Sequence, residues 1–312
     1  MTGKNNQSGI VVVHYGRMHE LANCLQVLTR DYPELPTVVV DNNEPLVDSP
    51  SPALNRDNIR RLSGHGNIGF AAGVNLGIKW LMSNTECRFF WVLNSDVQPL
   101  PDALSGLEQA ITSQPRVAVS GGLVIGQDDK VWSFGGTVDI QRQNVFMNHH
   151  GEQAGNFSSS TIIKKVDYVP GCSFLVSREA CEVVGPFPEH YFLYFEETHW
   201  CLQATRQGFT CLVNSKSRVM HDTDDNKMQS PLRVYFYNRN QLMFWSYWGG
   251  ISVRCQLFMQ TLLRKLPEAC RALASCADRR LSAVFWAHRQ ACLDFLLLRY
   301  GGRERVRQFL ID

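Results

Sequence analysis

Short apolar runs alternate with amphipathic stretches along the first 115 residues. In order, the elements we expect are strands or helices at 10–13, 18–30, 37–40, 59–62, 69–82, 89–93 and 101–112. The apolar runs of four or five residues have strand length, and the longer stretches carry apolar side chains at helical spacing. Repeated strand, helix, strand units predict a parallel sheet flanked by helices, which is typical of nucleotide-binding proteins.

The pattern changes after residue 117. The glycine pairs 121–122 and 135–136 predict turns between short strands, and the polar residues 141–160 predict a surface loop. Strand and helix patterns return over residues 166–220. Residues 231–312 are rich in aromatic, leucine and arginine residues, and we expect them to form helices.

Composition places the chain among globular proteins. Its 312 residues are 44% hydrophobic and 19% charged, which allows a full core and excludes a disordered chain. No apolar run approaches the roughly 18 residues that a membrane span needs. The ten cysteines form no CxxC pair and the N-terminus has no signal-peptide pattern, so we expect reduced thiols and a cytoplasmic location.

Charge is distributed unevenly although the net charge is only +2. From Arg254 onward there are 11 Lys/Arg and 5 Asp/Glu, against 20 and 24 in residues 1–253. The basic tail predicts either amphipathic helices that contact anionic lipid at the inner face of the cytoplasmic membrane or a helical hairpin packed on the protein with its arginines in water. Its basic residues include Arg254, Arg264, Lys265, Arg271, Arg279 and Arg280. A nucleic-acid partner is not indicated, because the body is mildly acidic and has no stripe of aromatic and basic residues.

Polar residues follow the first two predicted strands at their carboxyl ends, where parallel sheets bind ligands. His14 and Tyr15 follow the first strand, and Asp41 and Asn43 follow the second. The Asp41 carboxylate is suited to accept hydrogen bonds from a base or ribose, although Asp and Asn also form turns and helix caps. These four residues are candidates for binding a nucleotide.

A glycine-rich segment lies at 64–77 and contains Asn67, Gly69, Gly73 and Asn75. Its glycines allow the backbone to approach a ligand, and the N–H groups at the start of the following helix face an anion. The segment has no Walker lysine and no GxGxxG fingerprint. A flexible turn before a tightly packed helix is the alternative interpretation.

Asn94, Ser95 and Asp96 end the buried strand at 89–93. Oxygen ligands two residues apart can share a hard cation, Mg²⁺ or Mn²⁺, that neutralises the diphosphate of a leaving nucleotide. Asn and Asp also end strands in proteins without metals, and His221, near another strand end, is a second candidate ligand or an ordinary loop imidazole.

Two carboxylates, Glu196 and Glu197, stand at the start of a predicted helix. A carboxylate in this place can act as a general base on a hydroxyl. Acidic residues are also favourable at any helix N-terminus, so the pair taken alone has a structural explanation.

As an ordered set, these motifs resemble the family 2 glycosyltransferases, in particular the rhamnosyltransferase-like branch. The motifs are VDNN at 40–43, GNIGFAAGVN at 66–75, LNSD at 93–96, GCSFL at 171–175, FLYFEE at 192–197 and His221. The resemblance covers about residues 8–248, including YFYNRN at 235–240, which such enzymes often carry.

The resemblance implies an α/β fold of GT-A type, with a Rossmann-like, mostly parallel central sheet flanked by helices and a C-terminal helical segment. The catalytic domain would span residues 1–230, with a nucleotide-sugar half at about 8–115 and an acceptor half at about 116–230. Residues 231–312 would form the helical extension.

The implied activity is inverting transfer of a single sugar from a nucleoside-diphosphate sugar to a glycan or polyprenyl-linked acceptor in cell-surface polysaccharide synthesis. dTDP-L-rhamnose is the first candidate donor and a UDP-sugar the second. Asp96 and His221 would bind Mn²⁺ or Mg²⁺, and Glu197, or else Glu196, would be the base. Donor contacts are expected from His14, Tyr15, Asp41, Asn43, Asn67, Gly69, Gly73, Asn75, Asn94 and Ser95, and acceptor contacts from Gly171, Cys172, His199 and Trp200.

The base motif departs from the family pattern of Glu-Asp-x-Asp-Leu followed four residues later by Arg. Here His199 stands where the second Asp is usual, and Gln203 where the Arg is usual. A catalytically degenerate protein that binds nucleotide sugars or glycans is therefore the alternative function. The Gln-x-x-Arg-Trp signature of processive synthases is absent, which favours addition of one sugar.

Overall fold

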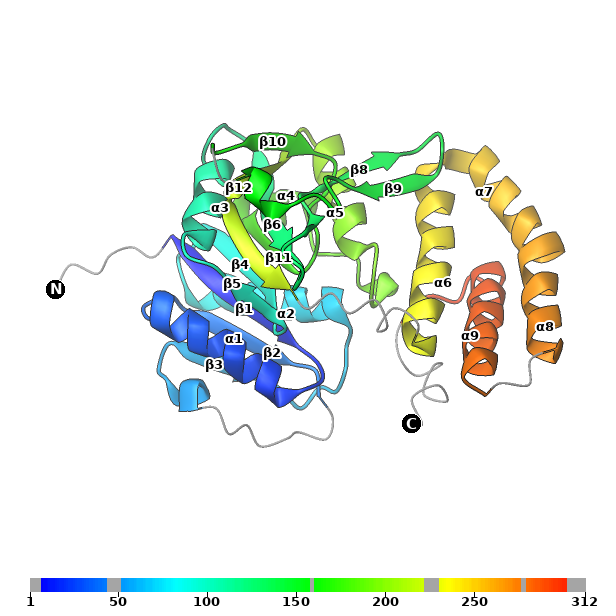
Figure 1. Ribbon diagram of the computed structural model, residues 1–312, viewed down its shortest axis with the longest axis horizontal. Helices are drawn as coiled ribbons and strands as arrows, with labels where there is room; N and C mark the ends of the chain where they lie inside the picture. Colours follow the sequence, from blue (N-terminus) through cyan, green and yellow to red (C-terminus); the bar gives the residue numbers. More distant parts are fainter. Residues whose placement is uncertain (1–6, 44–51, 158–159, 222–229, 276–278, 302–312) are drawn as a thin grey trace.

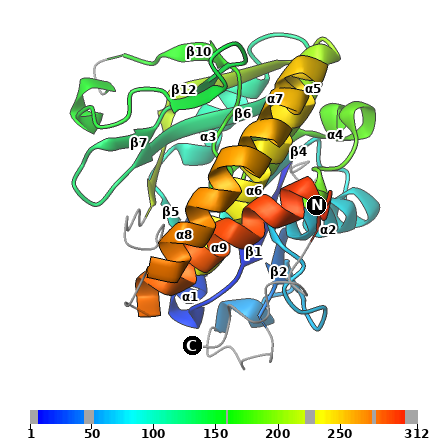
Figure 2. The ribbon, with the colours of Figure 1, turned by 90° about the vertical axis from the view of Figure 1, so that its right-hand side faces the viewer.

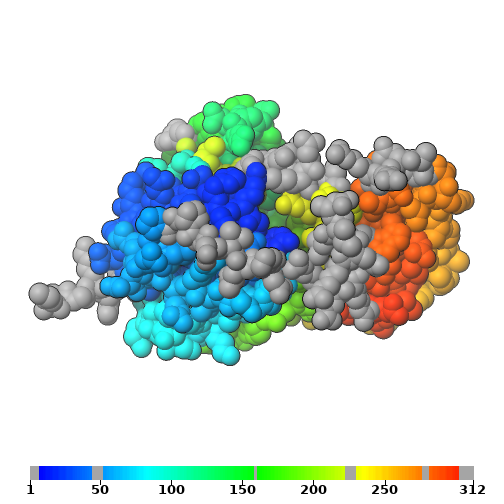
Figure 3. All heavy atoms as spheres, turned by 90° about the horizontal axis from the view of Figure 1, so that it is seen from below, coloured from blue at the N-terminus to red at the C-terminus, as the bar shows by residue number. Residues whose placement is uncertain are grey.

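A computed structural model describes residues 7–43, 52–157, 160–221, 230–275 and 279–301. It has two parts, an α/β body that contains the central sheet and a group of C-terminal helices beside it (Figure 1). The space-filling view shows the same two parts from below, with the body in blue and cyan and the helices in orange and red (Figure 3).

Four parallel strands form the N-terminal half of the sheet, in the order β3-β2-β1-β4. The elements of this half are β1 (Ser8–His14), α1 (Met18–Asp31), β2 (Thr37–Asp41), β3 (Ile59–Leu62), α2 (Phe70–Asn84), β4 (Phe89–Asn94), β5 (Val97–Pro99) and α3 (Ala103–Ile111). Each predicted helix and strand of this half is confirmed within a few residues.

Both faces of β1 are buried, which explains its unbroken apolar run. Ile10 and Val12 pack in one apolar cluster with α1 and α3, while Val11 and Val13 pack in another with α2. Helices therefore cover both faces of the sheet, and the carboxyl ends of its strands meet at one edge.

The second half of the body adds one antiparallel strand inside the sheet. Its elements are β6 (Val117–Ile125), β7 (Val131–Ser133), β8 (Gly136–Asp139), β9 (Asn144–Met147), β10 (Ile163–Val166), β11 (Ser173–Ser177), α4 (Arg178–Val184), α5 (Glu196–Arg206) and β12 (Thr210–His221). β11 lies between β4 and β6 and runs against both, whereas β12 runs parallel to β6. The predicted fold class, a mostly parallel sheet flanked by helices, is confirmed.

Two predictions for this half are wrong. The glycines at 121–122 lie inside β6 and not at a turn. Close packing explains the glycine at 122, since a Cβ atom there would lie 2.5 Å from the Ser217 carbonyl oxygen. The polar stretch 141–160 contains β9, which pairs with β8 in a separate hairpin. β9 is the apolar part of this otherwise polar stretch, with Val145, Phe146 and Met147 in a row, although its side chains are mostly exposed.

The C-terminal helices are α6 (Pro231–Trp248), α7 (Gly250–Gln260), α8 (Leu266–Ser275) and α9 (Arg279–Leu296), with a π-helical turn at Thr261–Lys265 between α7 and α8. Ser230 caps α6 by accepting a hydrogen bond from the Arg233 N–H. α6 lies next to the body and α7 and α8 lie farthest from it (Figures 1 and 2). The helical extension is present, and none of the described helices is long and apolar enough to cross a bilayer.

Candidate active site

His14 and Ser95 meet at the carboxyl edge of the sheet, at the ends of β1 and β4. The His14 Nδ1 atom lies 2.8 Å from the Ser95 Oγ atom. Burial lowers the pKa of His14, against the attraction of the Asp41 charge. Its Nε2 atom is buried and has no hydrogen-bond partner among the described residues. A neutral imidazole is thus held beside the Asn94–Asp96 segment, the predicted diphosphate site.

Asp41 is fully buried at the end of β2 and forms an ion pair with Arg61. The Arg61 Nη2 atom lies 2.5 Å from Asp41 Oδ2, and the Asn43 N–H donates to Oδ1 at 3.0 Å. The sequence motifs do not identify Arg61. Its only signal is a pair of arginines inside the short strand β3, next to β2 in the sheet.

Asn43 and Tyr15 lie beside the end of β1. Asn43 Oδ1 accepts from the Gly16 N–H at 2.9 Å, which ties the end of β2 to the loop after β1. Tyr15 is 47% exposed at this edge. Of these two residues, Asn43 contacts the Asp41 carboxylate through its N–H group.

The glycine-rich segment is fixed mainly by contacts within the protein. Asn67 Oδ1 accepts from the Gly69 N–H at 3.0 Å. Gly69 has φ +90°, and a Cβ atom there would lie 2.6 Å from the Phe192 carbonyl oxygen, so only glycine fits. Gly73 packs against Val13, where a Cβ atom would lie 3.0 Å from a methyl carbon. The glycines thus bring α2 close to both β1 and the segment before Glu196.

Asn75 is turned away from the strand ends toward the loop before α5. Its Nδ2 atom donates to the Phe187 carbonyl and to Glu189 Oε1, both at 2.9 Å, and its Oδ1 accepts from the Phe187 N–H at 2.8 Å. These bonds occupy the amide, which in this structure holds the loop at residues 187–189.

Asp96 and His221 are brought together by an antiparallel pairing between β5 and the end of β12. His221 pairs with Val97, the residue after Asp96, and its Nε2 atom lies 3.5 Å from Asp96 Oδ1. The ring of Trp132 packs against the imidazole with a centroid distance of 5.4 Å. Two residues that are 125 positions apart in the sequence therefore lie side by side near the end of β4.

The Asp96 and His221 pair fits a divalent cation in its donor chemistry. His221 Nδ1 is buried without a hydrogen-bond partner among the described residues, so the imidazole is not committed to a protein contact at that atom. Within the described ranges no three His, Cys, Asp or Glu residues form a metal-binding cluster. A cation held here would therefore take its other ligands from water and substrate phosphate oxygens, as Mg²⁺ commonly does.

Gly171 and Cys172 connect this position to Glu197. The Cys172 carbonyl accepts from the Asn94 N–H at 3.0 Å, because β11 runs antiparallel beside the end of β4. Burial raises the pKa of the Cys172 thiol, and the carboxylates of Asp96 and Glu197 raise it further. A Cβ atom at Gly171 would lie 3.7 Å from the carboxyl carbon of Glu197. The two acidic groups thus flank the same short segment.

Glu197 has the properties of a general base. Burial raises its pKa to about 7, against the opposing effect of backbone hydrogen bonds that include Gly171. Its Oε2 atom is buried with no partner among the described residues. A carboxyl group that titrates near neutral pH can accept a proton efficiently under those conditions.

Glu196 is more deeply enclosed, with 3% of its surface exposed. Burial raises its pKa, and the neighbouring Glu197 raises it further. The charge of Glu196 raises the pKa of Tyr191, which belongs to the aromatic cluster against the C-terminal helices. Glu197, in contrast, contacts the Gly171 segment. The geometry favours Glu197 over Glu196 as the base.

His199 and Trp200 are buried in the core and do not line the surface near Glu197. His199 is 4% exposed, and its Nδ1 atom is 3.2 Å from the Trp248 indole N–H and 3.0 Å from the Tyr191 hydroxyl. Because an indole can only donate, Nδ1 is an acceptor, and burial lowers the pKa of His199 to about 4. Trp200 is fully buried and donates to the Gly185 carbonyl at 2.9 Å.

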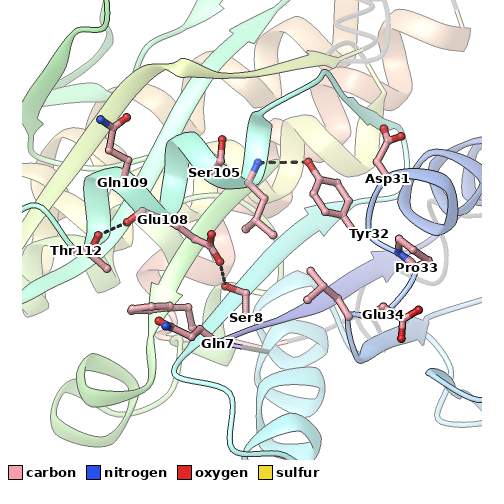
Figure 4. Close-up of a pocket in the computed structure, with 13 residues that line it drawn as sticks. Gln7, Ser8, Asp31, Tyr32, Pro33, Glu34, Ser105, Glu108, Gln109 and Thr112 are labelled. Carbon is pink, nitrogen blue, oxygen red and sulfur yellow. Dashed lines mark hydrogen bonds between the residues drawn. The ribbon is translucent and has the colours of Figure 1, made fainter. Parts of the chain in front are cut away.

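A pocket of about 800 Å³ lies at the opposite edge of the sheet. It is lined by residues at the amino ends of β1 and β4, where Ser8 donates to Glu108 (Figure 4). No predicted site residue lines this pocket. Ligands of open α/β sheets bind at the carboxyl ends of strands, so this pocket is not the candidate active site.

Comparisons with known proteins identify the family of this chain. The glycosyl transferase family 2 model matches residues 9–185. A low-salt glycan biosynthesis hexosyltransferase, Agl10 of Haloferax volcanii, is 22% identical over 246 residues, covering 75% of this chain and 74% of that protein. The N-acetylglucosaminyl-diphospho-decaprenol L-rhamnosyltransferase of Mycobacterium tuberculosis is 23% identical over 294 residues, covering 82% and 94%.

A solved structure shares the fold. The crystal structure of GalNAc-T7 with UDP, GalNAc and Mn²⁺ superposes with a TM-score of 0.61 at 12% identity. The match covers 95% of this chain and 57% of that chain. At this identity the likeness concerns the fold alone.

Proposed function

The chain belongs to glycosyl transferase family 2, and on that premise we propose that it transfers one sugar, with inversion, from a nucleoside-diphosphate sugar to a glycan or lipid-linked saccharide. The observation that carries the proposal is the placement of Asp96, His221 and Glu197 around the Gly171–Cys172 segment. Donor diphosphate and acceptor hydroxyl would then meet at the carboxyl edge of the sheet.

Glu197 would accept the proton of the acceptor hydroxyl as the oxygen attacks the anomeric carbon. The bond from that carbon to the diphosphate oxygen breaks on the opposite face, and the nucleoside diphosphate leaves. The carboxylate is aligned by α5 and lies against Gly171, which has no side chain to separate it from an acceptor. Inversion follows from this single displacement because one base on one face is sufficient.

Asp96 and His221 would hold the divalent cation, with Asn94 and Ser95 beside them. Such a cation, when bound, neutralises the charge that develops on the leaving diphosphate. His14 positions Ser95 through a 2.8 Å contact, and Asp41 with Arg61 would accommodate the nucleoside end of the donor.

The donor that we propose first is dTDP-L-rhamnose, with a UDP-sugar second. The activity of the mycobacterial relative supports rhamnose and a polyprenyl-linked acceptor, and the match to that relative covers 82% of this chain. The hexosyltransferase relative supports the wider donor class.

The departures at His199 and Gln203 leave the proposed base in place. His199 fills a buried position between Tyr191 and Trp248, where its neutral imidazole has hydrogen-bond partners. The residue thus has a packing function that does not remove Glu197 from the site. This favours an active enzyme over a degenerate binding protein of the same fold.

The outer face of α7 and α8 supports a peripheral contact with anionic lipid. Large apolar side chains are exposed there, including Ile251 at 76% and Leu263 at 67%, next to the exposed Arg254 and Arg264. Exposed apolar and basic side chains thus occur together in α7 and in the π-helical turn that follows it, a combination that suits the interface of an anionic bilayer. The side chains of Arg279 and Arg280 and residues 302–312 lie outside the described part.

The direct test of the lipid contact is co-sedimentation with vesicles of anionic or zwitterionic lipid at low salt. We expect binding to anionic vesicles, weakened by the double variant Ile251→Ser with Leu263→Ser. An equal amount of wild type in the pellet with both vesicle types, or none with either, would contradict the contact.

The test of the transfer reaction is product analysis with dTDP-L-rhamnose and UDP-sugars and a polyprenyl-diphosphate-linked saccharide acceptor. We expect one added sugar whose anomeric configuration is opposite to that of the donor. A product with retained configuration would contradict the single displacement, and binding of donors without any product would support the degenerate protein.

A further inference from the structure

The segment just before the proposed base has an unusual backbone. Phe192, Tyr194 and Phe195 have φ values of +69°, +71° and +73°. Residues with a Cβ atom adopt this left-handed conformation only at an energetic cost, especially aromatic ones. Glu196 and Glu197 follow directly and begin α5. The direction in which α5 starts, and therefore the position of the Glu197 carboxylate, depends on what holds this segment.

Asn240 of α6 binds the segment through one amide group. Its Nδ2 atom lies 2.8, 2.6 and 3.2 Å from the carbonyl oxygens of Tyr191, Leu193 and Tyr194. The side chain is fully buried. Because these carbonyls face a buried region, loss of the amide would leave them without this donor, which is costly in a protein interior.

Arg239 reinforces the same contact from the neighbouring position. Its guanidinium donates to the Tyr191 carbonyl at 3.0 Å and to Asn240 Oδ1 at 3.0 Å, although the side chain is only 1% exposed. Burial lowers the pKa of Arg239, and nearby Tyr235 and Asp294 oppose that effect. A buried guanidinium directed at backbone carbonyls orients a chain segment, since its fork of donors has a fixed geometry.

The network continues to the last described helix. The Tyr235 hydroxyl donates to Asp294 of α9 at 2.6 Å and accepts from Arg239 at 3.4 Å. Asp294 is fully buried, so this link lies inside the helical extension. On its other side, the segment accepts a hydrogen bond at the Phe192 carbonyl from the Phe70 N–H at 2.8 Å, at the start of α2.

We propose that Arg239 and Asn240 are positioning residues of the transfer reaction, through which the C-terminal helical extension sets the orientation of the base Glu197 relative to the donor. This inference rests on the proposed function for the role of Glu197. It assigns to the extension a task within the active site, in addition to the lipid contact proposed for its outer face. Neither residue touches the reacting atoms, and both act through the segment at 191–195.

The experiment compares Asn240→Asp and Tyr235→Phe with Asn238→Ala. The aspartate is isosteric but lacks the N–H donors, and phenylalanine keeps the ring while removing the hydroxyl. Asn238 is the matched control, because it lies on the same helix and its amide donates at 2.7 Å to the Val234 carbonyl of that helix. Transfer rates, donor affinity by direct titration, and melting temperature are measured for each protein.

We expect kcat of Asn240→Asp to fall by about 10- to 100-fold, because displacing a catalytic base by roughly 1 Å slows the chemical step by up to about that factor. Donor affinity should stay unchanged within about twofold. Tyr235→Phe should lower kcat by a smaller factor, and Asn238→Ala should match the wild type. A fall in donor affinity equal to the fall in kcat, or a kcat that stays equal to the control, would overturn the proposal.

A second readout separates this inference from the proposed function. Amide hydrogen exchange of residues 189–199 should be faster in Asn240→Asp than in Asn238→Ala, whether or not a substrate has been found. If the wild type transfers no sugar, the proposed function fails. If exchange in this segment is equal in the two variants, the positioning role fails regardless of activity.

Discussion

The two acidic groups of the candidate site reach their positions by different routes. Asp96 lies in the turn between the central strand β4 and β5, and its partner His221 is fixed by the pairing of β5 with β12. Glu197 follows three aromatic residues in left-handed conformations, and the carbonyls of that segment are held by Asn240 of α6. Sheet register therefore fixes the Asp96 and His221 pair, which we propose as the metal side of the site, while the proposed base side depends on side chains from the helical extension.

The comparison indicates how the two sides respond to change. A strand end surrounded by paired strands has few alternative conformations, so a substitution there should act on chemistry and leave the fold intact. A strained segment has alternatives of lower energy once its anchors are removed. Substitutions that affect the base side should therefore alter geometry before they alter donor binding.

The largest effect is expected for Glu197→Gln. Loss of the base should lower kcat for transfer by about 10²- to 10⁴-fold, with donor binding retained. Glu196→Gln is the matched variant and should lower kcat much less, because Glu196 is more deeply buried and only Glu197 contacts the Gly171 segment. Steady-state transfer assays of both variants measure the difference, and a larger loss in Glu196→Gln would reverse the assignment.

A smaller effect is expected for His221→Ala on the metal side. Removing one of two protein ligands should raise the Mn²⁺ concentration for half-maximal activity by about 10- to 100-fold, the range seen when metal-site residues are altered. Activity at saturating Mn²⁺ should recover in part. An unchanged Mn²⁺ titration would exclude His221 from the metal site.

The base side also predicts a pH dependence. Because burial raises the pKa of Glu197 to about 7, the active deprotonated form is lost as the pH falls through that value. The rate should then decrease about tenfold for each pH unit well below the pKa. The kcat profile of the wild type measures this, and an acidic limb near the ordinary carboxyl value would contradict a buried base.

The smallest effect is expected for Asn67→Ala in the glycine-rich segment. The substitution removes one hydrogen bond to the Gly69 N–H, which should cost about 0.5–1.5 kcal/mol of unfolding free energy. Chemical denaturation measures the change. A large loss of activity without a loss of stability would instead point to a donor contact by Asn67.

The strand-end side of the site is more predictable from the sequence than the base side. Apolar runs locate the strands of a parallel sheet, so the sequence pattern alone places Asp41 and Asp96 at one edge. The pattern does not reveal Arg61, because its pairing with Asp41 depends on the order of neighbouring strands. Gly121 and Gly122 wrongly predict a turn, since close packing and chain reversal both select glycine.

The residues that hold the base side carry no local signal of their role. Arg239 and Asn240 belong to the YFYNRN stretch, yet their partners at 190–194 lie more than 40 residues away in the sequence. The prediction that His199 and Trp200 contact the acceptor rests on their nearness to Glu197 in the sequence. On a helix, neighbouring residues point in different directions, and these two point into the core.

The most direct test of the central claim is nucleoside-diphosphate release from dTDP-, UDP- and GDP-sugars in the presence of acceptor, with Mn²⁺, Mg²⁺ or EDTA, for the wild type and Asp96→Ala. The account predicts release from one donor that requires the metal and is lost in the variant. If the wild type released as much nucleoside diphosphate in EDTA as with metal, or if Asp96→Ala released as much as the wild type, the assignment of Asp96 and His221 to a cation would be contradicted.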